Sequence, residues 1–116
     1  MGPAGLIWRG EVHDVDLGQP VGHEAAFGRP AVVVSTGLVN NGPGGLVAVV
    51  PISSRSYGLR SQVELQAGSS GLGRTSFARC DQVRVVSTKR LAGHRGMLGA
   101  DELRFVDRAL RFILGL

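Results

Sequence analysis

The segment Ala31-Val-Val-Val34 is followed by Asn40-Asn-Gly-Pro-Gly-Gly45 and then by Leu46-Val-Ala-Val-Val50. The first and last of these segments are continuous apolar runs rich in valine, which is typical of strands buried on both faces. The glycine-rich segment between them is the strongest turn signal in the chain. We therefore predict two fully buried strands separated by a turn.

Weaker strand patterns lie on both sides of these two runs. Residues 11–17 mix apolar and polar side chains as a half-buried strand does, and residues 62–66 alternate cleanly. Residues 75–80 and 82–86 form either a strand pair or one bent strand. The 18 glycines and 5 prolines, with only 5% aromatic residues, indicate many turns between short strands.

The apolar periodicity changes at the end of the chain. Within residues 100–114, acidic residues in the first turn and arginines near the last turn complement a helix dipole, and Gly99 is the predicted N-cap. Strands grouped before one helix favour a mainly β (α+β) fold, a small antiparallel barrel with the C-terminal helix packed on it. The apolar residues at helical spacing are Leu103, Val106, Leu110, Ile113 and Leu114.

Two phenylalanines form a second apolar stripe on the predicted helix. Phe105 and Phe112 are seven residues apart, so they share one side, roughly half a turn from the first stripe. One helix face packs on the barrel, and the second stripe needs a different cover. Either a loop of the same chain or a second copy of the chain supplies that cover.

Length and composition restrict the class of protein. The 116 residues form one domain, residues 1–116, with a globular composition of 43% hydrophobic and 19% charged residues. No apolar run approaches the roughly 18 residues of a membrane span, and we expect no signal peptide at the start. Cys80 is the only cysteine, which excludes an internal disulfide and fits a cytoplasmic protein.

The basic residues are almost all arginine. Lys89 is the only lysine among 13 basic side chains, and the net charge is +4. Arginine is the planar, permanently charged donor suited to phosphate, although a GC-rich genome also produces such a bias. The charge balance is compatible with an anionic partner.

Polar side chains near strand ends and in loops are candidates for RNA chemistry. Cutting RNA without a metal needs a base for the 2′-hydroxyl, an acid for the departing 5′-oxygen and a cation for the crowded phosphorane. On a strand, the side chains of Arg79 and Asp81 point to the same face. A solvated loop histidine and a surface ion pair are the ordinary alternatives for such residues. The candidates are His23, Arg29, Ser53, Ser54, Arg79 and Asp81.

Other catalytic patterns are absent from the sequence. It contains no P-loop, H-E-x-x-H, C-x-x-C or G-x-S-x-G motif. His13, His23 and His94 are scattered along the chain, so we expect no metal site and no cofactor. Cys80 is expected to be an inert strand cysteine that faces the core.

Five short motifs, in their order and spacing, resemble the MazF/PemK/Kid toxins of type II toxin–antitoxin modules. The resemblance extends over residues 8–116, and no single motif would carry it alone. The motifs are Arg9-Gly-Glu-Val-His-Asp-Val-Asp-Leu17, Gly22-His-Glu24, Gly28-Arg-Pro30 with its valine run, Val50-Pro-Ile-Ser-Ser54, and Arg79-Cys-Asp-Gln-Val-Arg84.

The resemblance implies an SH3-like antiparallel barrel with a C-terminal helix, working as a homodimer. It implies sequence-specific, metal-independent cleavage of single-stranded RNA, mostly messenger RNA. The implied products carry 2′,3′-cyclic phosphate and 5′-hydroxyl ends. A labile, acidic antitoxin is the implied partner, which wraps the dimer and blocks the site.

The family has two versions of the active site, and this sequence resembles both. In one version, Asp81 is the base, and Arg79 is the proton donor or the phosphate clamp. Because arginine is a poor acid, we favour the clamp, with His23 as the candidate acid. In the other version, Arg29 stabilises the phosphate, and Ser53 bonds it or aligns the 2′-hydroxyl. Ser53 replaces the usual threonine of the family.

Base recognition in the family comes partly from loops after strands. There, aromatic rings stack on bases and arginines hold phosphates. The ordinary alternatives are loop packing for Tyr57 and core packing for Phe77. The candidates here are Ser54, Arg55, Tyr57, Arg60, Thr75 and Phe77.

Two other functions are compatible with the predicted fold. One is a gyrase-poisoning toxin of the CcdB type, which is similar in fold, and the other is a non-catalytic binding barrel. Neither function needs the acid, base and cation candidates together. Their joint presence therefore favours the endoribonuclease.

Overall fold

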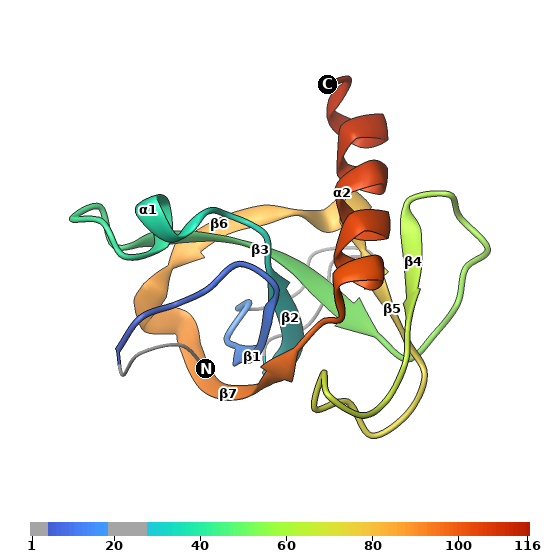
Figure 1. Cartoon of the computed structure of the whole chain (residues 1–116), viewed down its shortest axis with the longest axis horizontal. Helices are drawn as coiled ribbons and strands as arrows, with labels where there is room; N and C mark the ends of the chain where they lie inside the picture. Colours follow the sequence, from blue (N-terminus) through green and yellow to red (C-terminus); the bar gives the residue numbers. More distant parts are fainter. Residues whose placement is uncertain (1–4, 19–27) are drawn as a thin grey trace.

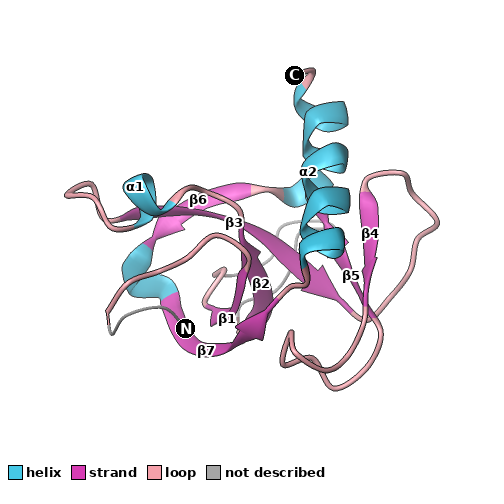
Figure 2. Cartoon of the chain, in the orientation of Figure 1, coloured by secondary structure: helices cyan, strands magenta, loops and turns pink. Residues whose placement is uncertain are grey.

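Seven short strands and a long C-terminal helix dominate the computed structural model, which describes residues 5–18 and 28–116 (Figure 1, Figure 2). In chain order the elements are β1 (Glu11–Val15), β2 (Arg29–Val33), α1 (Gly37–Asn40), β3 (Leu46–Ser53), β4 (Gln62–Leu65), β5 (Ser76–Arg79), the 3-10 turn η1 (Cys80–Gln82), β6 (Arg84–Ser87), the 3-10 turn η2 (Thr88–Arg90), β7 (Leu91–Met97) and α2 (Ala100–Leu114).

The strands form one antiparallel sheet in the order β4-β5-β3-β2-β1-β7, and β6 also pairs with β3. Strand β3 therefore lies at the centre, with β2 on one side and with β5 and β6 on the other. Within the described ranges, no ladder joins β4 to β7, so the barrel-like sheet is not a closed ring of paired strands. This architecture confirms the predicted antiparallel barrel with a C-terminal helix.

Both faces of the central strands are buried. Val32 and Val50 belong to a hydrophobic cluster that includes residues of α2, whereas Val33 and Val49 belong to a second cluster on the opposite face. Successive side chains alternate between the faces of a strand, so a continuous valine run fills both clusters. The two predicted buried strands are thus parts of β2 and β3, although Leu46 at the outer end is exposed.

Helix α2 has the predicted bounds and the predicted N-cap, Gly99. Val106 and Ala109 are buried against the sheet. Leu114 was expected on the buried stripe, but it is 56% exposed because the C-terminal end of the helix projects past the sheet (Figure 1). Phe105 and Phe112 are 51% and 56% exposed. No helix in the described part of the chain is long and apolar enough to span a membrane.

Strands β5 and β6 are two parts of one bent strand beside β3, which was one of the two predicted alternatives. Ser53 pairs with Phe77, and Val49 pairs with Arg84. The offset between these pairs shows that η1 inserts extra residues on one side of the ladder, as a bulge does. The bulge bends the strand directly after Arg79.

The sequence pattern did not predict β7 or α1. Strand β7 carries Gly93 and Gly96 and is mostly exposed, so it has neither a valine run nor clean alternation. Helix α1 is a four-residue turn of helix before the predicted glycine-rich turn. The sheet of the described residues consequently contains a strand, β7, that the sequence pattern did not indicate.

A close backbone contact joins the two ends of the sheet. The N–H of Met97 in β7 donates to the carbonyl oxygen of Ser69, in the loop after β4, at 2.9 Å. A Cβ atom added to Gly96 would lie 2.1 Å from that same oxygen. Glycine at this position therefore allows β7 and the loop to approach each other.

We expect Gly96→Ala to lower the free energy of unfolding by about 1–3 kcal/mol, the usual cost of forcing an extra methyl group into a packed site. Urea denaturation measures the change. Gly73→Ala is the matched control, because nothing lies within 4 Å of a Cβ atom added there. Equal stability of the two variants would contradict the close contact.

Candidate functional site

The C-terminal end of β3 carries the predicted hydroxyl. Ser53 pairs with Phe77 of β5, and the preceding pair is Ile52 with Ala78. Ile52 and Ala78 are buried in the cluster that includes α2. Because side chains alternate along a strand, Ser53 and Phe77 face the opposite side of the sheet. Both are half-buried there.

Arg29 begins β2 on the other side of β3. Ala31 pairs with Pro51 in the β2–β3 ladder, and the same register continued by two residues places Arg29 opposite Ser53. The Arg29 side chain is exposed. His23, the predicted acid, lies outside the residues that the structure describes.

Arg79 and Asp81 form the charged pair of the site. Arg79 is the last residue of β5, and its Nη2 lies 3.5 Å from Oδ2 of Asp81. Asp81 belongs to η1 and not to a strand, so the same-face argument from strand alternation was wrong for it. The bulge instead brings the carboxylate back beside the guanidinium. The side chains are 11% and 34% exposed.

An aromatic ring lies on the same guanidinium. The Cζ atom of Arg79 is 4.8 Å from the centroid of the Tyr57 ring, within the range of a cation–π contact. Tyr57 comes from the loop between β3 and β4 and is 47% exposed. Arg79 is therefore flanked by an aromatic face and a carboxylate, an arrangement that holds a permanent cation in a defined place.

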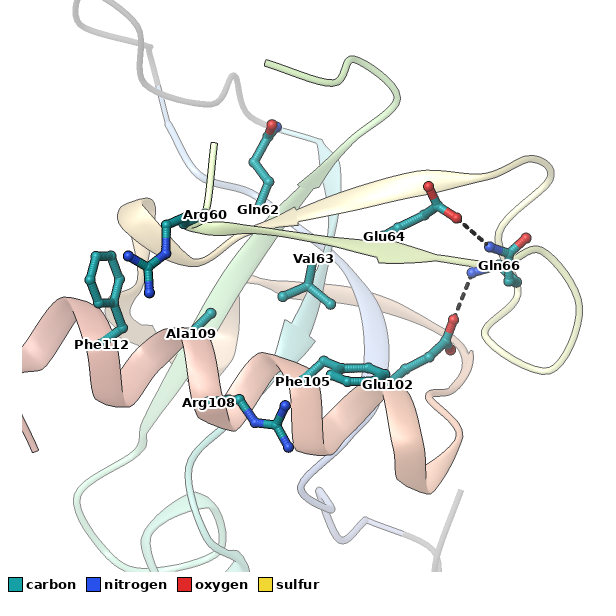
Figure 3. Close-up of a pocket in the computed structure, with 10 residues that line it drawn as sticks. All are labelled: Arg60, Gln62, Val63, Glu64, Gln66, Glu102, Phe105, Arg108, Ala109 and Phe112. Carbon is teal, nitrogen blue, oxygen red and sulfur yellow. Dashed lines mark hydrogen bonds between the residues drawn. The ribbon is translucent and has the colours of Figure 1, made fainter. Parts of the chain in front are cut away.

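The other loop candidates lie in two different places. Ser54 and Arg55 are exposed, and the N–H of Arg55 donates to Oγ of Ser53 at 3.1 Å. The guanidinium of Arg60 lies 4.4 Å from the ring centroid of Phe112 and thus points toward α2 (Figure 3). Ser54 and Arg55 are therefore at the end of β3, whereas the Arg60 side chain is on the helix side.

Thr75 and Phe77 lie along the approach to β5. Thr75 is exposed, and its hydroxyl donates to Oε1 of Gln66 at 3.3 Å. Phe77 is paired with Ser53 on one side and with Glu64 on the other. Phe77 is thus beside the candidate hydroxyl, and Thr75 is two residues farther out.

Sequence reasoning missed Gln62, the first residue of β4. Its Oε1 accepts a hydrogen bond from the N–H of Tyr57 at 2.6 Å, and its Nε2 donates to the carbonyl of Arg55 at 3.2 Å. Gln62 also pairs with Arg79 across the β4–β5 ladder. The alternating pattern of residues 62–66 shows only that this side chain faces away from the core, so no signal in the sequence identifies it.

A cluster of buried Glu11 and His13 with the more exposed His94 was also missed, because the histidines were expected to be scattered. The ring centroids of His13 and His94 are 5.3 Å apart, and each Nε2 lies 3.3–3.4 Å from an oxygen of Glu11. The antiparallel β1–β7 ladder pairs these two histidines. Among the described residues, no group of three or more His, Cys, Asp or Glu side chains is arranged to hold a metal ion.

Cys80 is fully buried in η1, between the two charged residues of the site. Burial, with smaller contributions from the carboxylates of Asp81 and Asp107, raises the pKa of its thiol to about 12. The thiol is therefore neutral at physiological pH and faces the core, as expected, although it lies in a bulge and not in a strand.

A groove of about 630 Å³ lies between β4 and α2 (Figure 3), and neither Arg79 nor Asp81 lines it. Phe105 and Phe112 form its helix side. In Figure 3, Val63 points from β4 toward the helix, whereas Gln62 and Glu64 point to the other side of the strand. Gln62 and Glu64 nevertheless belong to the lining of the groove, so β4 borders both the groove and the candidate active site.

The chain belongs to the PemK-like, MazF-like toxins of type II toxin–antitoxin systems, since the model of that family matches residues 8–114. It is similar to Endoribonuclease MazF9 of Mycobacterium tuberculosis, with 38% identity over 116 residues that cover 96% of this chain and 98% of that protein. The family resemblance that the five motifs indicate is therefore confirmed.

Solved structures show the same fold. The crystal structure of MazF from Deinococcus radiodurans has a TM-score of 0.82 and 27% identity, and covers 96% of this chain and 98% of its own. A MazE–MazF crystal structure from the same organism has a TM-score of 0.77 and 28% identity, with coverages of 96% and 97%. The barrel with its C-terminal helix is thus the fold of solved MazF structures.

Proposed function

We propose that this chain is the toxin of a type II toxin–antitoxin module and acts as a metal-independent, sequence-specific endoribonuclease on single-stranded RNA. The observation that carries the proposal is the Arg79–Asp81 pair, 3.5 Å apart and one strand away from Ser53. Family membership and the similarity to a protein named as an endoribonuclease support it. Cleavage of messenger RNA in the cytoplasm stops translation and growth.

The proposed reaction is an in-line transesterification. The carboxylate of Asp81 removes the proton of the 2′-hydroxyl, the 2′-oxygen attacks phosphorus, and the bond from phosphorus to the 5′-oxygen breaks. A general acid gives a proton to the departing oxygen, which leaves 2′,3′-cyclic phosphate and 5′-hydroxyl ends. Arg29 and Arg79 stabilise the negative charge of the phosphorane, and Ser53 bonds the phosphate or aligns the 2′-hydroxyl.

The surroundings of Arg79 support its role as the clamp. Its guanidinium lies beside the Asp81 carboxylate and the Tyr57 ring, both of which stabilise a retained positive charge. A group with this role keeps its proton throughout the reaction. The proposal therefore assigns proton donation to His23.

Removing the base tests the proposal. Asp81→Asn keeps the shape of the side chain, and we expect it to slow RNA cleavage by about 100- to 10,000-fold, the usual contribution of a general base. Growth toxicity should fall with it, while folding and antitoxin binding remain. Gel analysis of a long RNA, with EDTA present, measures the rate.

Asp101→Asn is the control for this variant, because Asp101 is an exposed aspartate that pairs with Arg104 at the start of α2. It should cleave like the wild type. Full activity of Asp81→Asn would rule out Asp81 as the base. A wild-type protein that is toxic but cleaves no RNA would instead favour a CcdB-like toxin or a non-catalytic barrel.

We further propose an acidic antitoxin as the natural partner. The net charge of +4 comes mainly from arginines, and Arg29 and Arg55 are exposed near the end of β3. Carboxylates of an antitoxin can occupy the positions of RNA phosphates there. The MazE–MazF structure similar to this chain supports a partner of the MazE kind.

We propose that the chain forms a homodimer, in which the second copy covers the apolar stripe of Phe105 and Phe112 on α2. Phe105 and Phe112 remain 51% and 56% exposed, although arginine side chains lie over both rings. Large exposed aromatic rings on one helix side are typical of an interaction surface. Of the two alternatives for this stripe, the exposure favours a second copy of the chain.

We expect the double variant Phe105→Glu plus Phe112→Glu to dissociate the dimer, because it places two carboxylates in an apolar contact. Light scattering should show the mass of a monomer, and RNA cleavage should fall in parallel if the dimer builds the RNA groove. Arg104→Glu, an exposed change on the same helix, is the control. A double variant that stays dimeric and fully active would contradict this surface.

A further inference from the structure

We infer that Gln62 is a positioning residue of the cleavage site, which holds the β3–β4 loop so that Ser53 and Arg79 are both aligned for RNA. This inference rests on the proposed endoribonuclease function. The attachment of the loop by the side-chain amide of Gln62 does not depend on that function. Gln62 itself touches no reacting atom of the proposed cleavage reaction.

The side-chain amide of Gln62 satisfies two opposite backbone groups. Its Oε1 accepts from the N–H of Tyr57 at 2.6 Å, and its Nε2 donates to the carbonyl of Arg55 at 3.2 Å. A backbone N–H only donates and a carbonyl only accepts, so one orientation of the amide satisfies both. Glutamate lacks the donor, methionine makes neither bond, and asparagine is one methylene shorter.

Burial of apolar side chains does not attach this loop to the sheet. Every residue from Ser54 to Arg60 is exposed, so no buried apolar side chain anchors the segment. At its far end, the carbonyl of Leu59 accepts from the N–H of Gln62, and the carbonyl of Ser61 accepts from the N–H of Cys80. These contacts fix where the loop rejoins β4, whereas the Gln62 side chain fixes the middle of the loop.

Each of the two loop residues held by Gln62 contacts a group of the site. The N–H of Arg55 donates to Oγ of Ser53 at 3.1 Å, and the ring of Tyr57 lies 4.8 Å from Cζ of Arg79. Gln62 also stands directly opposite Arg79 in the β4–β5 ladder. One side chain thus connects the orientation of the hydroxyl to the position of the cation.

The first test measures the loop without RNA. In Gln62→Met, a substitution of similar length, the Tyr57 amide loses its acceptor, so its hydrogen exchange, followed by NMR, should accelerate at least several-fold. Gln62→Glu retains the acceptor, so the Tyr57 amide should stay protected in that variant. Unchanged exchange in Gln62→Met, with unchanged thermal unfolding, would overturn the inference even if the wild type cleaves RNA.

The second test measures cleavage. We expect Gln62→Met to lower kcat by roughly 10- to 100-fold with an unchanged unfolding temperature, because a displacement of about 1 Å can cost about a hundredfold in rate. Glu64→Met is the matched control, since Glu64 is on the same strand and the same side but has its hydrogen bond with Gln66. Equal rates for both variants would overturn the inference.

A double-mutant cycle separates positioning from general damage. If Gln62 acts through the loop, Gln62→Met should cost little further rate in a Tyr57→Ala background, because the contact that it orients is already lost. Fully multiplicative losses would show that Gln62 does not act through Tyr57. A wild type without RNA cleavage would defeat the proposed function, whereas the exchange result would still decide whether Gln62 holds the loop.

Discussion

Strand β3 is hydrogen-bonded on both sides, to β2 and to the bent strand that β5 and β6 form, and this double pairing places Ser53, Phe77 and Arg29 beside one another at the candidate site. Ser53 pairs with Phe77 on one side, and the continued register of the β2–β3 ladder places Arg29 opposite it on the other side. A shift of one residue in either ladder would turn the corresponding side chains into the core. The valines of the two hydrophobic clusters oppose such a shift, because it would expose them and bury polar groups.

The bulge η1 brings the two charged candidates of the site together at the edge of this frame. A regular strand would carry Asp81 away along the ladder, whereas the bulge leaves its carboxylate 3.5 Å from the Arg79 guanidinium. The Arg79 side chain is 11% exposed and that of Asp81 is 34% exposed, so the carboxylate of the pair remains accessible from solvent. This accessibility supports the proposed roles of Asp81 as the base and of Arg79 as the phosphate clamp.

Hydrophobic periodicity predicted the parts of the fold that burial controls. The valine runs of β2 and β3 were predictable because both faces of these strands contact a core, and the stripe of α2 because one face of the helix does. Strand β7 was not predicted, since an exposed strand with two glycines carries no such pattern.

The sequence predicted which residues belong to the candidate site better than it predicted how they are arranged. Residue types and the family resemblance indicated Arg79 and Asp81, but nothing in the local sequence places a bulge between them. The role of Gln62 depends on hydrogen bonds to loop backbone, and any exposed strand glutamine has the same sequence pattern. The pairing of His13 with His94 depends likewise on the β1–β7 register.

We propose that β3 unites two sets of site residues into one site, in which Arg29 and Arg79 act on the same phosphate. The rates of RNA cleavage by Arg29→Ala, Arg79→Ala and the double variant decide whether it does. Each single change should cost about 100-fold or more, as loss of one stabilising donor does. Because residues that act as a unit are strongly non-additive, the double variant should lose much less than the product of the single losses. Independent, multiplicative losses, or an Arg29→Ala variant with the wild-type rate, would contradict the claim.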